Sequence, residues 1–102
     1  MKVITMCGSL KFKDDIIRWT EKLELEGNCV LSIIYPTAAD KDAYTPQQHD
    51  LLDVLHNKKI DLSDAIFVVN VNGYIGSSTR KEIEYAKARG KEVLFLEDCK
   101  AR

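Results

Sequence analysis

Glu82 is the residue whose type and position most clearly offer chemistry. The apolar run at residues 65–69 predicts a buried strand, residues 70–76 form a polar turn that contains glycine, and a helix is expected to begin at Ser78 or Thr79. In an open parallel sheet, a strand, a turn and a helix N-terminus in this order form the edge where ligands bind. Glu82 would then stand in the first turn of the helix, beside that edge.

Two interpretations of Glu82 compete. Thr79 and Glu82 have the spacing of a capping box, in which the glutamate accepts a hydrogen bond from the N-cap amide and complements the helix dipole. In the other interpretation the carboxylate faces a bound ligand and attacks it. Both interpretations use the same carboxylate oxygens, so a glutamate that caps its own helix is not free to react.

Three segments should meet at this edge of the sheet. Residues 7–9 follow a predicted strand at 2–6, residues 35–44 form a long polar loop after a strand at 29–34, and residues 70–82 follow the third strand. They supply hydroxyl and amide groups together with free N–H groups at helix starts, which suit a polar, sugar-like or phosphorylated small molecule. The candidate ligand-binding residues are Gly8, Ser9, Asn70, Gly76 and Ser78.

Helices between the strands must position these segments. The second helix should begin at Thr45, with Pro46 at its first position and Gln48 completing a capping box, and should end near Lys59. A third helix is expected over residues 79–89, and a last strand over 93–96. The apolar faces that the first two helices should bury are Phe12, Ile16, Trp19 and Leu23, and Leu51, Leu52 and Leu55.

The alternation of four strands with three helices predicts right-handed crossovers and a parallel sheet. We therefore predict a single α/β domain over residues 1–102. Its expected fold is a flavodoxin-like or Rossmann-like arrangement of three layers, with a four-stranded parallel sheet in the order 2-1-3-4.

Composition excludes several classes of function. The chain has 102 residues, 45% of them apolar and 30% charged, with a formal net charge of −1. Neither a basic stripe nor a run of like charges is present, so we expect no nucleic-acid or membrane partner. No apolar stretch approaches the roughly 20 residues of a membrane span, and the N-terminus does not resemble a signal peptide. A cytoplasmic protein is expected.

No motif indicates a metal or a cofactor. The three cysteines are widely spaced and give no zinc pattern. The position of Cys7 at the end of the first strand allows a reactive thiol, although a buried and inert cysteine is the favoured interpretation. Phosphate-binding P-loop and dinucleotide fingerprints are absent. His49 and His56 lie seven residues apart on one helix, which is too far for one metal without further ligands. Asp64 precedes the third strand and so belongs to the opposite edge.

Several segments together resemble the nucleoside 2-deoxyribosyltransferase-like family, which includes the 2′-deoxynucleoside 5′-phosphate N-hydrolases. They are the Cys-Gly-Ser at residues 7–9, the Asp-x-x-Asp at 61–64, and the stretch from Gly76 to Ala86 that contains Glu82. The similarity covers nearly the whole chain, and the segment around Glu82 is its most specific part. The likeness is greatest to small bacterial and phage proteins of this group.

The resemblance implies a function for Glu82. In the family the matching glutamate attacks the anomeric carbon of a deoxyribosyl group, and water or a second base resolves the ester. Gly8 and Ser9 match the loop that holds the sugar or its phosphate. The sequence departs from the family where His56 occupies the place of an acidic residue, with Asp53 one turn earlier; His56 could be the acid that protonates the leaving base.

The expected activity is therefore cleavage of an N-glycosidic bond, or deoxyribosyl transfer, on a nucleoside or deoxynucleotide, with Glu82 and His56 as catalytic residues and no cofactor. A module that binds a nucleotide or sugar phosphate without catalysis is the main alternative, and a purely structural or partner-binding protein is a weaker one. A homo-oligomer is expected in each case, because a four-stranded sheet leaves edges and helix faces to cover.

Overall fold

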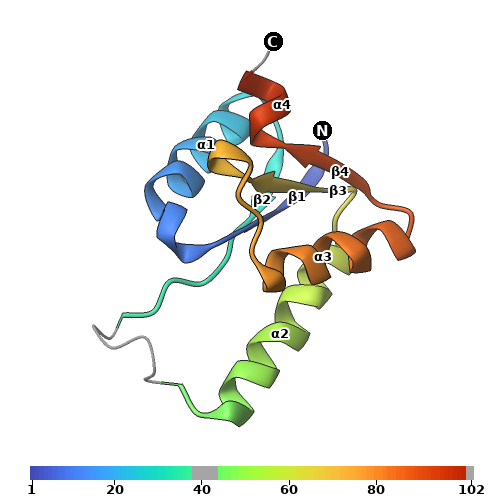
Figure 1. Ribbon diagram of the computed structural model, residues 1–102. Coiled ribbons are helices and arrows are strands. Elements are labelled where there is room, and N and C mark those ends of the chain that lie inside the picture. Colours follow the sequence, from blue (N-terminus) through green and yellow to red (C-terminus); the bar gives the residue numbers. More distant parts are fainter. Residues whose placement is uncertain (38–43, 101–102) are drawn as a thin grey trace.

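Four parallel strands form the centre of the protein, with helices on both faces (Figure 1). The computed structural model describes residues 1–37 and 44–100. The strands lie in the order β2-β1-β3-β4, which confirms the predicted topology. Their bounds are β1 (Val3–Gly8), β2 (Cys29–Leu31), β3 (Ala65–Val69) and β4 (Glu92–Phe95).

The middle of the sheet is buried on both faces because β3 is apolar throughout. Ala65, Phe67 and Val69 face the layer that contains α1 (Lys13–Leu25), where Trp19 stacks on Phe67 with ring centroids 5.1 Å apart. Ile66 and Val68 face the opposite layer. A continuous apolar run is what a central strand covered on both sides requires, and the two cores follow from the two-residue period of the strand.

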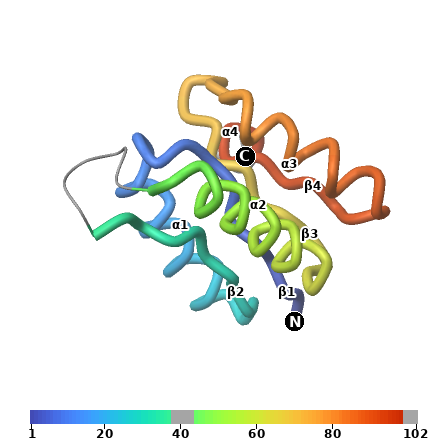
Figure 2. The backbone as a smooth tube through the Cα atoms, turned by 90° about the horizontal axis from the view of Figure 1, so that it is seen from below, coloured from blue at the N-terminus to red at the C-terminus, as the bar shows by residue number. Residues whose placement is uncertain are grey.

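The second layer is made by the C-terminal end of α2 (Pro46–Asp61) and by α3 (Ser77–Ala88), as Figure 2 shows from below the sheet. The predicted capping box at the start of α2 is confirmed: the Thr45 hydroxyl accepts from the Gln48 amide at 3.1 Å, and the Gln48 side chain accepts from the Thr45 amide at 2.9 Å. The remaining helices are η1 (Leu10–Phe12), η2 (Val71–Gly73) and α4 (Leu96–Lys100).

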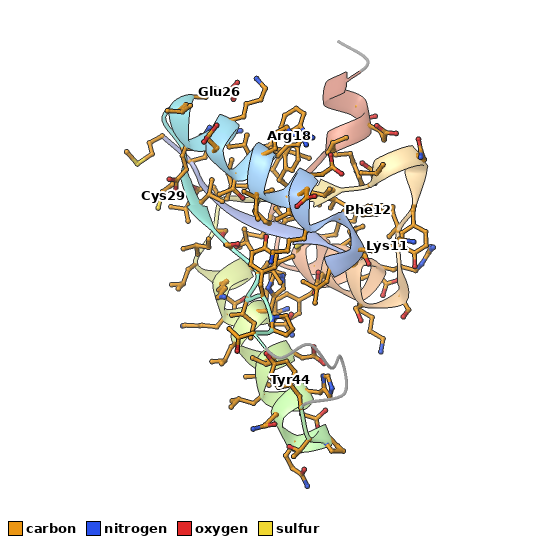
Figure 3. All side chains as sticks on the ribbon, turned by 90° about the vertical axis from the view of Figure 1, so that its left-hand side faces the viewer. Lys11, Phe12, Arg18, Glu26, Cys29 and Tyr44 are labelled. Carbon is orange, nitrogen blue, oxygen red and sulfur yellow. The ribbon has the colours of Figure 1, made fainter. Side chains whose placement is uncertain are left out.

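The N-terminal half of α2 extends beyond the sheet (Figures 1 and 3). The prediction that Leu51 and Leu55 belong to a buried face is therefore wrong: they are 55% and 47% exposed. Only the last turns of α2 reach the core, where Ile60 is fully buried. Within the described residues, no helix combines the length and apolar character that crossing a membrane would require.

The other differences from the predicted elements concern their ends. β2 ends at Leu31, earlier than expected, and the chain continues without regular structure through Thr37. The short helix α4 follows β4 and was not predicted. Residues 38–43 of the predicted loop lie outside the described residues.

Candidate active site

A cavity of about 1060 Å³ lies at the C-terminal edge of the sheet. It is bounded by the residues after β1 and β2, by the inner side of α2 and by the first two turns of α3. Its walls differ in chemistry. The side formed by the chain after β1 and by α3 is mostly polar, whereas the side formed by the chain after β2 and by α2 combines an apolar patch with the polar side chains of His49, Asp53 and His56. The apolar patch consists of Ile33, Ile34, Pro36, Leu52 and Leu55.

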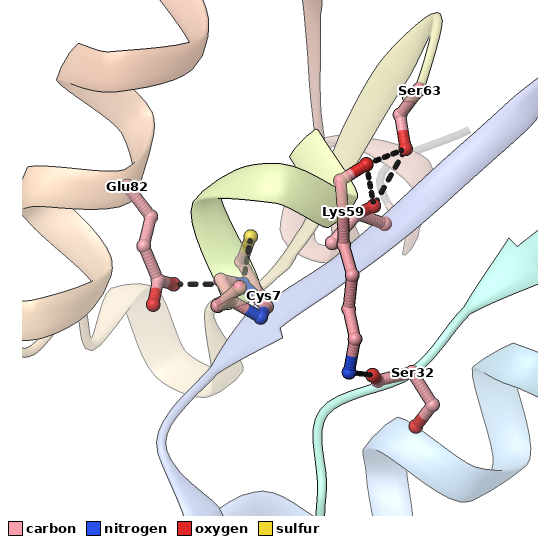
Figure 4. Close-up of polar contacts among 7 residues, drawn as sticks. Cys7, Ser32, Lys59, Ser63 and Glu82 are labelled. Carbon is pink, nitrogen blue, oxygen red and sulfur yellow. Dashed lines mark hydrogen bonds and ion pairs between the residues drawn. The ribbon is translucent and has the colours of Figure 1, made fainter. Parts of the chain in front are cut away.

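Glu82 lines this cavity and does not cap its helix. α3 begins at Ser77 with Gly76 as its N-cap, earlier than the sequence suggested, so Glu82 stands in the second turn. The predicted capping box between Thr79 and Glu82 is therefore wrong. The carboxylate of Glu82, which is labelled in Figure 4, instead approaches His56, with Glu82 Oε1 3.6 Å from His56 Nε2. The carboxylate oxygens of Glu82 are therefore directed to the cavity and are not used to cap the helix.

His56 is held in place by the anchoring of α2 on β1. The Thr5 hydroxyl lies 2.6 Å from the Ser63 hydroxyl and donates to the Lys59 carbonyl at 3.0 Å, and Ser63 donates to the same carbonyl at 2.8 Å (Figure 4). The Lys59 ammonium donates to the Ser32 carbonyl beyond β2 at 2.9 Å. One turn earlier on α2, His56 is consequently fixed above the end of β1, with its side chain only 11% exposed.

Cys7 lies beside Glu82 and His56, and the three side chains form a cluster at the cavity. Sequence reasoning did not assign Cys7 to the site. Its Sγ lies 3.5 Å from His56 Nε2, and the residue is fully buried. Cys7 and Thr5 share one face of β1, the face that meets α2 and α3. The one signal in the sequence was the position of Cys7 at the end of a strand. Ligand-type atoms of Cys7, His56 and Glu82 all lie within 4.8 Å of one another, close enough to share one ion.

The environment changes the ionisation of all three groups. Burial raises the pKa of Glu82 from 4.5 to about 7, and the charge of Asp53 adds to this, while a hydrogen bond with Cys7 opposes it. Burial lowers the pKa of His56 from 6.5 to about 4, and the charge of Lys59 lowers it further, against an opposing effect of Asp53. Burial, together with Glu82, raises the pKa of the Cys7 thiol well above 9.0. The carboxyl group of Glu82 is therefore the more basic of the pair: it holds a proton below about pH 7 and populates both of its forms near neutral pH, while His56 is uncharged there.

Four of the five predicted ligand-binding residues line the cavity: Gly8, Ser9, Gly76 and Ser78. Gly8 is also required for packing, because a Cβ there would lie 3.2 Å from the Cβ of Val69. Asn70 is not among the lining residues. Its side chain accepts from the Glu97 amide at 3.0 Å and so holds the start of α4.

The remaining sequence candidates do not belong to the cluster of Cys7, His56 and Glu82. His49 lines the same cavity but is exposed, and it packs edge-on against Tyr44 at 5.6 Å between ring centroids, on the side of the molecule that Figure 3 shows. Asp64 accepts from the Val3 amide at 2.8 Å at the N-terminal edge of the sheet, as expected. At the mouth of the cavity the Lys11 ammonium lies 3.3 Å from the ring centroid of Tyr74.

The cluster favours carboxylate chemistry over thiol chemistry. In a thiol–imidazole–carboxylate relay, the thiol and the carboxylate bind opposite nitrogens of the ring. Here Cys7 and Glu82 both approach Nε2 of His56, and Cys7 is inaccessible. The accessible reactive group is the Glu82 carboxylate, 22% exposed, beside a cavity that could hold a small molecule.

No protein-family model matches the chain, and a search of curated proteins likewise finds no match.

Proposed function

We propose that this protein cleaves the N-glycosidic bond of a nucleoside or deoxynucleotide, or transfers its deoxyribosyl group, with Glu82 as the nucleophile. The observation that carries the proposal is the direction of the Glu82 carboxylate, which faces a cavity and a histidine instead of its own helix N-terminus. The sequence resemblance around Glu82 supports the same assignment.

The mechanism starts from the form of the protein in which the Glu82 carboxyl group is protonated and His56 is neutral. Transfer of this proton from the carboxyl group to Nε2, which are 3.6 Å apart, would create a carboxylate nucleophile and an imidazolium acid together. The carboxylate then attacks the anomeric carbon as the C–N bond breaks, and the electron pair of that bond leaves with the base, which takes the proton from His56. Water or a second base resolves the glycosyl ester and releases Glu82.

The two walls of the cavity suit the two ends of such a substrate. The apolar patch from the chain after β2 and from α2 offers a surface for a flat base. On the other side, α3 begins at Ser77, and its N-cap residue Gly76 has no side chain to cap the first N–H groups. Uncapped N–H groups at the start of a twelve-residue helix favour an anion, which supports a 5′-phosphorylated substrate.

Release of free base tests the proposal. The protein should release base from at least one deoxynucleoside or its 5′-monophosphate, as measured by chromatography. Glu82→Ala should abolish the release, whereas Glu84→Ala, an exposed glutamate on the same helix, should retain it. Failure of the wild-type protein to release base from any common deoxynucleoside or monophosphate would contradict the proposal.

A second candidate is a module that binds a nucleotide or sugar phosphate without turnover. It is favoured by the low pKa of His56, about 4, which leaves little imidazolium to protonate a leaving group near neutral pH. This candidate predicts that a nucleoside monophosphate raises the melting temperature while no base is released. The proposed enzyme predicts both stabilisation and release.

We also propose a cytoplasmic homo-oligomer. The free thiols of Cys7 and Cys29 support a reducing compartment. Exposed apolar side chains on α2, among them Leu51 and Val54 at 55% and 63% exposure, support a contact with a second copy. Light scattering should show a dimer that Val54→Glu converts to a monomer; a wild-type monomer at all concentrations would contradict this.

A further inference from the structure

Three side chains of zinc-binding type converge at one end of the cavity. Cys7 comes from β1, His56 from α2 and Glu82 from α3. Their ligand atoms all lie within 4.8 Å of one another, with 3.5 Å between Cys7 Sγ and His56 Nε2 and 3.6 Å between that nitrogen and Glu82 Oε1. Each element is independently anchored in the core, so the convergence belongs to the fold and not to a mobile surface.

The separations match those between ligands of a tetrahedral zinc ion. With Zn–S of about 2.3 Å, Zn–N of about 2.0–2.1 Å and Zn–O of about 2.0–2.2 Å, tetrahedral angles put sulfur and nitrogen about 3.6 Å apart and nitrogen and oxygen about 3.4 Å apart. The two printed separations agree with these values within a few tenths of an ångström. Sulfur and a carboxylate oxygen should be about 3.6 Å apart in such a site, so from a separation of at most 4.8 Å they must close by up to about 1.2 Å, which a rotation of the Glu82 side chain can supply.

Charge and access also fit a metal ion. A thiolate and a carboxylate together carry two negative charges, which equal the charge of Zn²⁺, so the loaded site would be neutral and its burial inexpensive. Cys7 is fully buried, whereas His56 and Glu82 line the cavity. A fourth coordination position would therefore open onto the cavity, as it does in sites where zinc keeps a water or a substrate.

We propose that Cys7, His56 and Glu82 bind Zn²⁺ through Sγ, Nε2 and a carboxylate oxygen, with one position open to the cavity. The combination of thiolate and imidazole ligands selects zinc or cobalt over magnesium and calcium, which prefer all-oxygen sites. Binding displaces the thiol proton of Cys7 and any proton on Glu82 into solvent. Metal binding does not depend on the proposed glycosyl chemistry, and the two would exclude each other, because the ion takes the electron pair that a nucleophilic Glu82 needs.

Cobalt spectroscopy on the full chain tests this site. The test protein carries Cys29→Ser and Cys99→Ser, which leaves Cys7 as the sole thiol among the three cysteines of the sequence. Titration with Co²⁺ should produce a sulfur-to-cobalt charge-transfer band in the near ultraviolet and visible bands of tetrahedral intensity. One equivalent of Zn²⁺ should abolish both the charge-transfer band and the visible bands. Absence of the charge-transfer band in a folded protein would overturn the proposal.

Single variants assign the ligands. Cys7→Ser should remove the charge-transfer band, and Glu82→Gln should weaken zinc affinity by at least about tenfold in competition with a chromophoric chelator, since removal of even a group that supports a ligand has that effect. Glu84→Gln should leave the affinity unchanged. Equal affinity for the Glu82 and Glu84 variants, or an unchanged band in Cys7→Ser, would overturn the proposal. Circular dichroism establishes that each variant is folded. The zinc titrations contain no nucleoside, so their outcome does not depend on whether the protein releases base.

Discussion

Replacing Glu82 by glutamine should remove a pH-dependent cost of folding. Burial raises the pKa of Glu82 from 4.5 to about 7. Between these values the folded protein holds a proton that the unfolded chain has released, so its free energy of unfolding falls as the pH rises. Each pH unit corresponds to about 1.4 kcal/mol. The ionisation of Glu82 should therefore make the free energy of unfolding about 3 kcal/mol lower above pH 7 than below pH 4.5. Glu82→Gln should restore about that much stability above pH 7.

His56 contributes with the opposite sign. Its pKa falls from 6.5 in the unfolded chain to about 4 in the folded protein, so stability is lost as the pH falls through this window. In the wild-type protein the two trends oppose each other between about pH 4.5 and 6.5, and the free energy of unfolding should change little. Glu82→Gln leaves the contribution of His56 alone, and its stability should rise with pH across the same window.

Urea unfolding between pH 4 and 8 measures this difference. The single tryptophan, Trp19, stacks on Phe67 in the core and reports unfolding by fluorescence. EDTA is present throughout to keep the protein free of metal. Glu84→Gln is the matched control, because this glutamate is exposed on the same helix, and its stability should parallel that of the wild type. A difference between Glu82→Gln and wild type that stays constant over this range would refute the reasoning.

Four further predictions concern the supports and chemistry of the site. Thr5→Val should lower the free energy of unfolding by about 1–2 kcal/mol, because it removes hydrogen bonds that anchor α2. Gly8→Ala should lower it by about 1–3 kcal/mol, because the added Cβ would crowd Val69. Urea denaturation measures both effects, and an unchanged midpoint in either variant would contradict the prediction for it. His56→Asn should slow base release by roughly 100-fold or more, and a wild-type rate would remove His56 from the mechanism. Zinc should inhibit base release and EDTA should restore it; activation by zinc would contradict a nucleophilic Glu82.

The fold was predictable because strong local signals agreed with one another. The apolar run at 65–69 marked a central strand, and the Thr45 capping box marked the start of α2; the structure confirms both. The buried face of α2 was not predictable from periodicity alone. Leu51 and Leu55 have helical spacing, but α2 extends beyond the sheet that would cover them.

The site was predictable only in part. The start of α3 was ambiguous, since Gly76 and the hydroxyl residues after it can all serve as N-cap, and this choice decides whether Glu82 caps the helix. Nor could the sequence place Cys7 beside His56, because 49 positions separate them and their contact depends on how α2 docks on β1. The role of Asn70 at α4 was hidden because α4 itself was not foreseen.

Mass spectrometry of the protein after acid quenching during turnover tests the role of Glu82 most directly. With a deoxynucleoside as substrate the intact mass should increase by one deoxyribosyl group, and with its 5′-monophosphate by one phosphodeoxyribosyl group. In both cases the added group should lie on a peptide that contains Glu82, and one equivalent of base should be released for each group added. Glu82→Ala should show neither change, and Glu84→Ala should show both. Base release that persists in Glu82→Ala, or a glycosyl group on another residue, would contradict the assignment of Glu82 as the nucleophile.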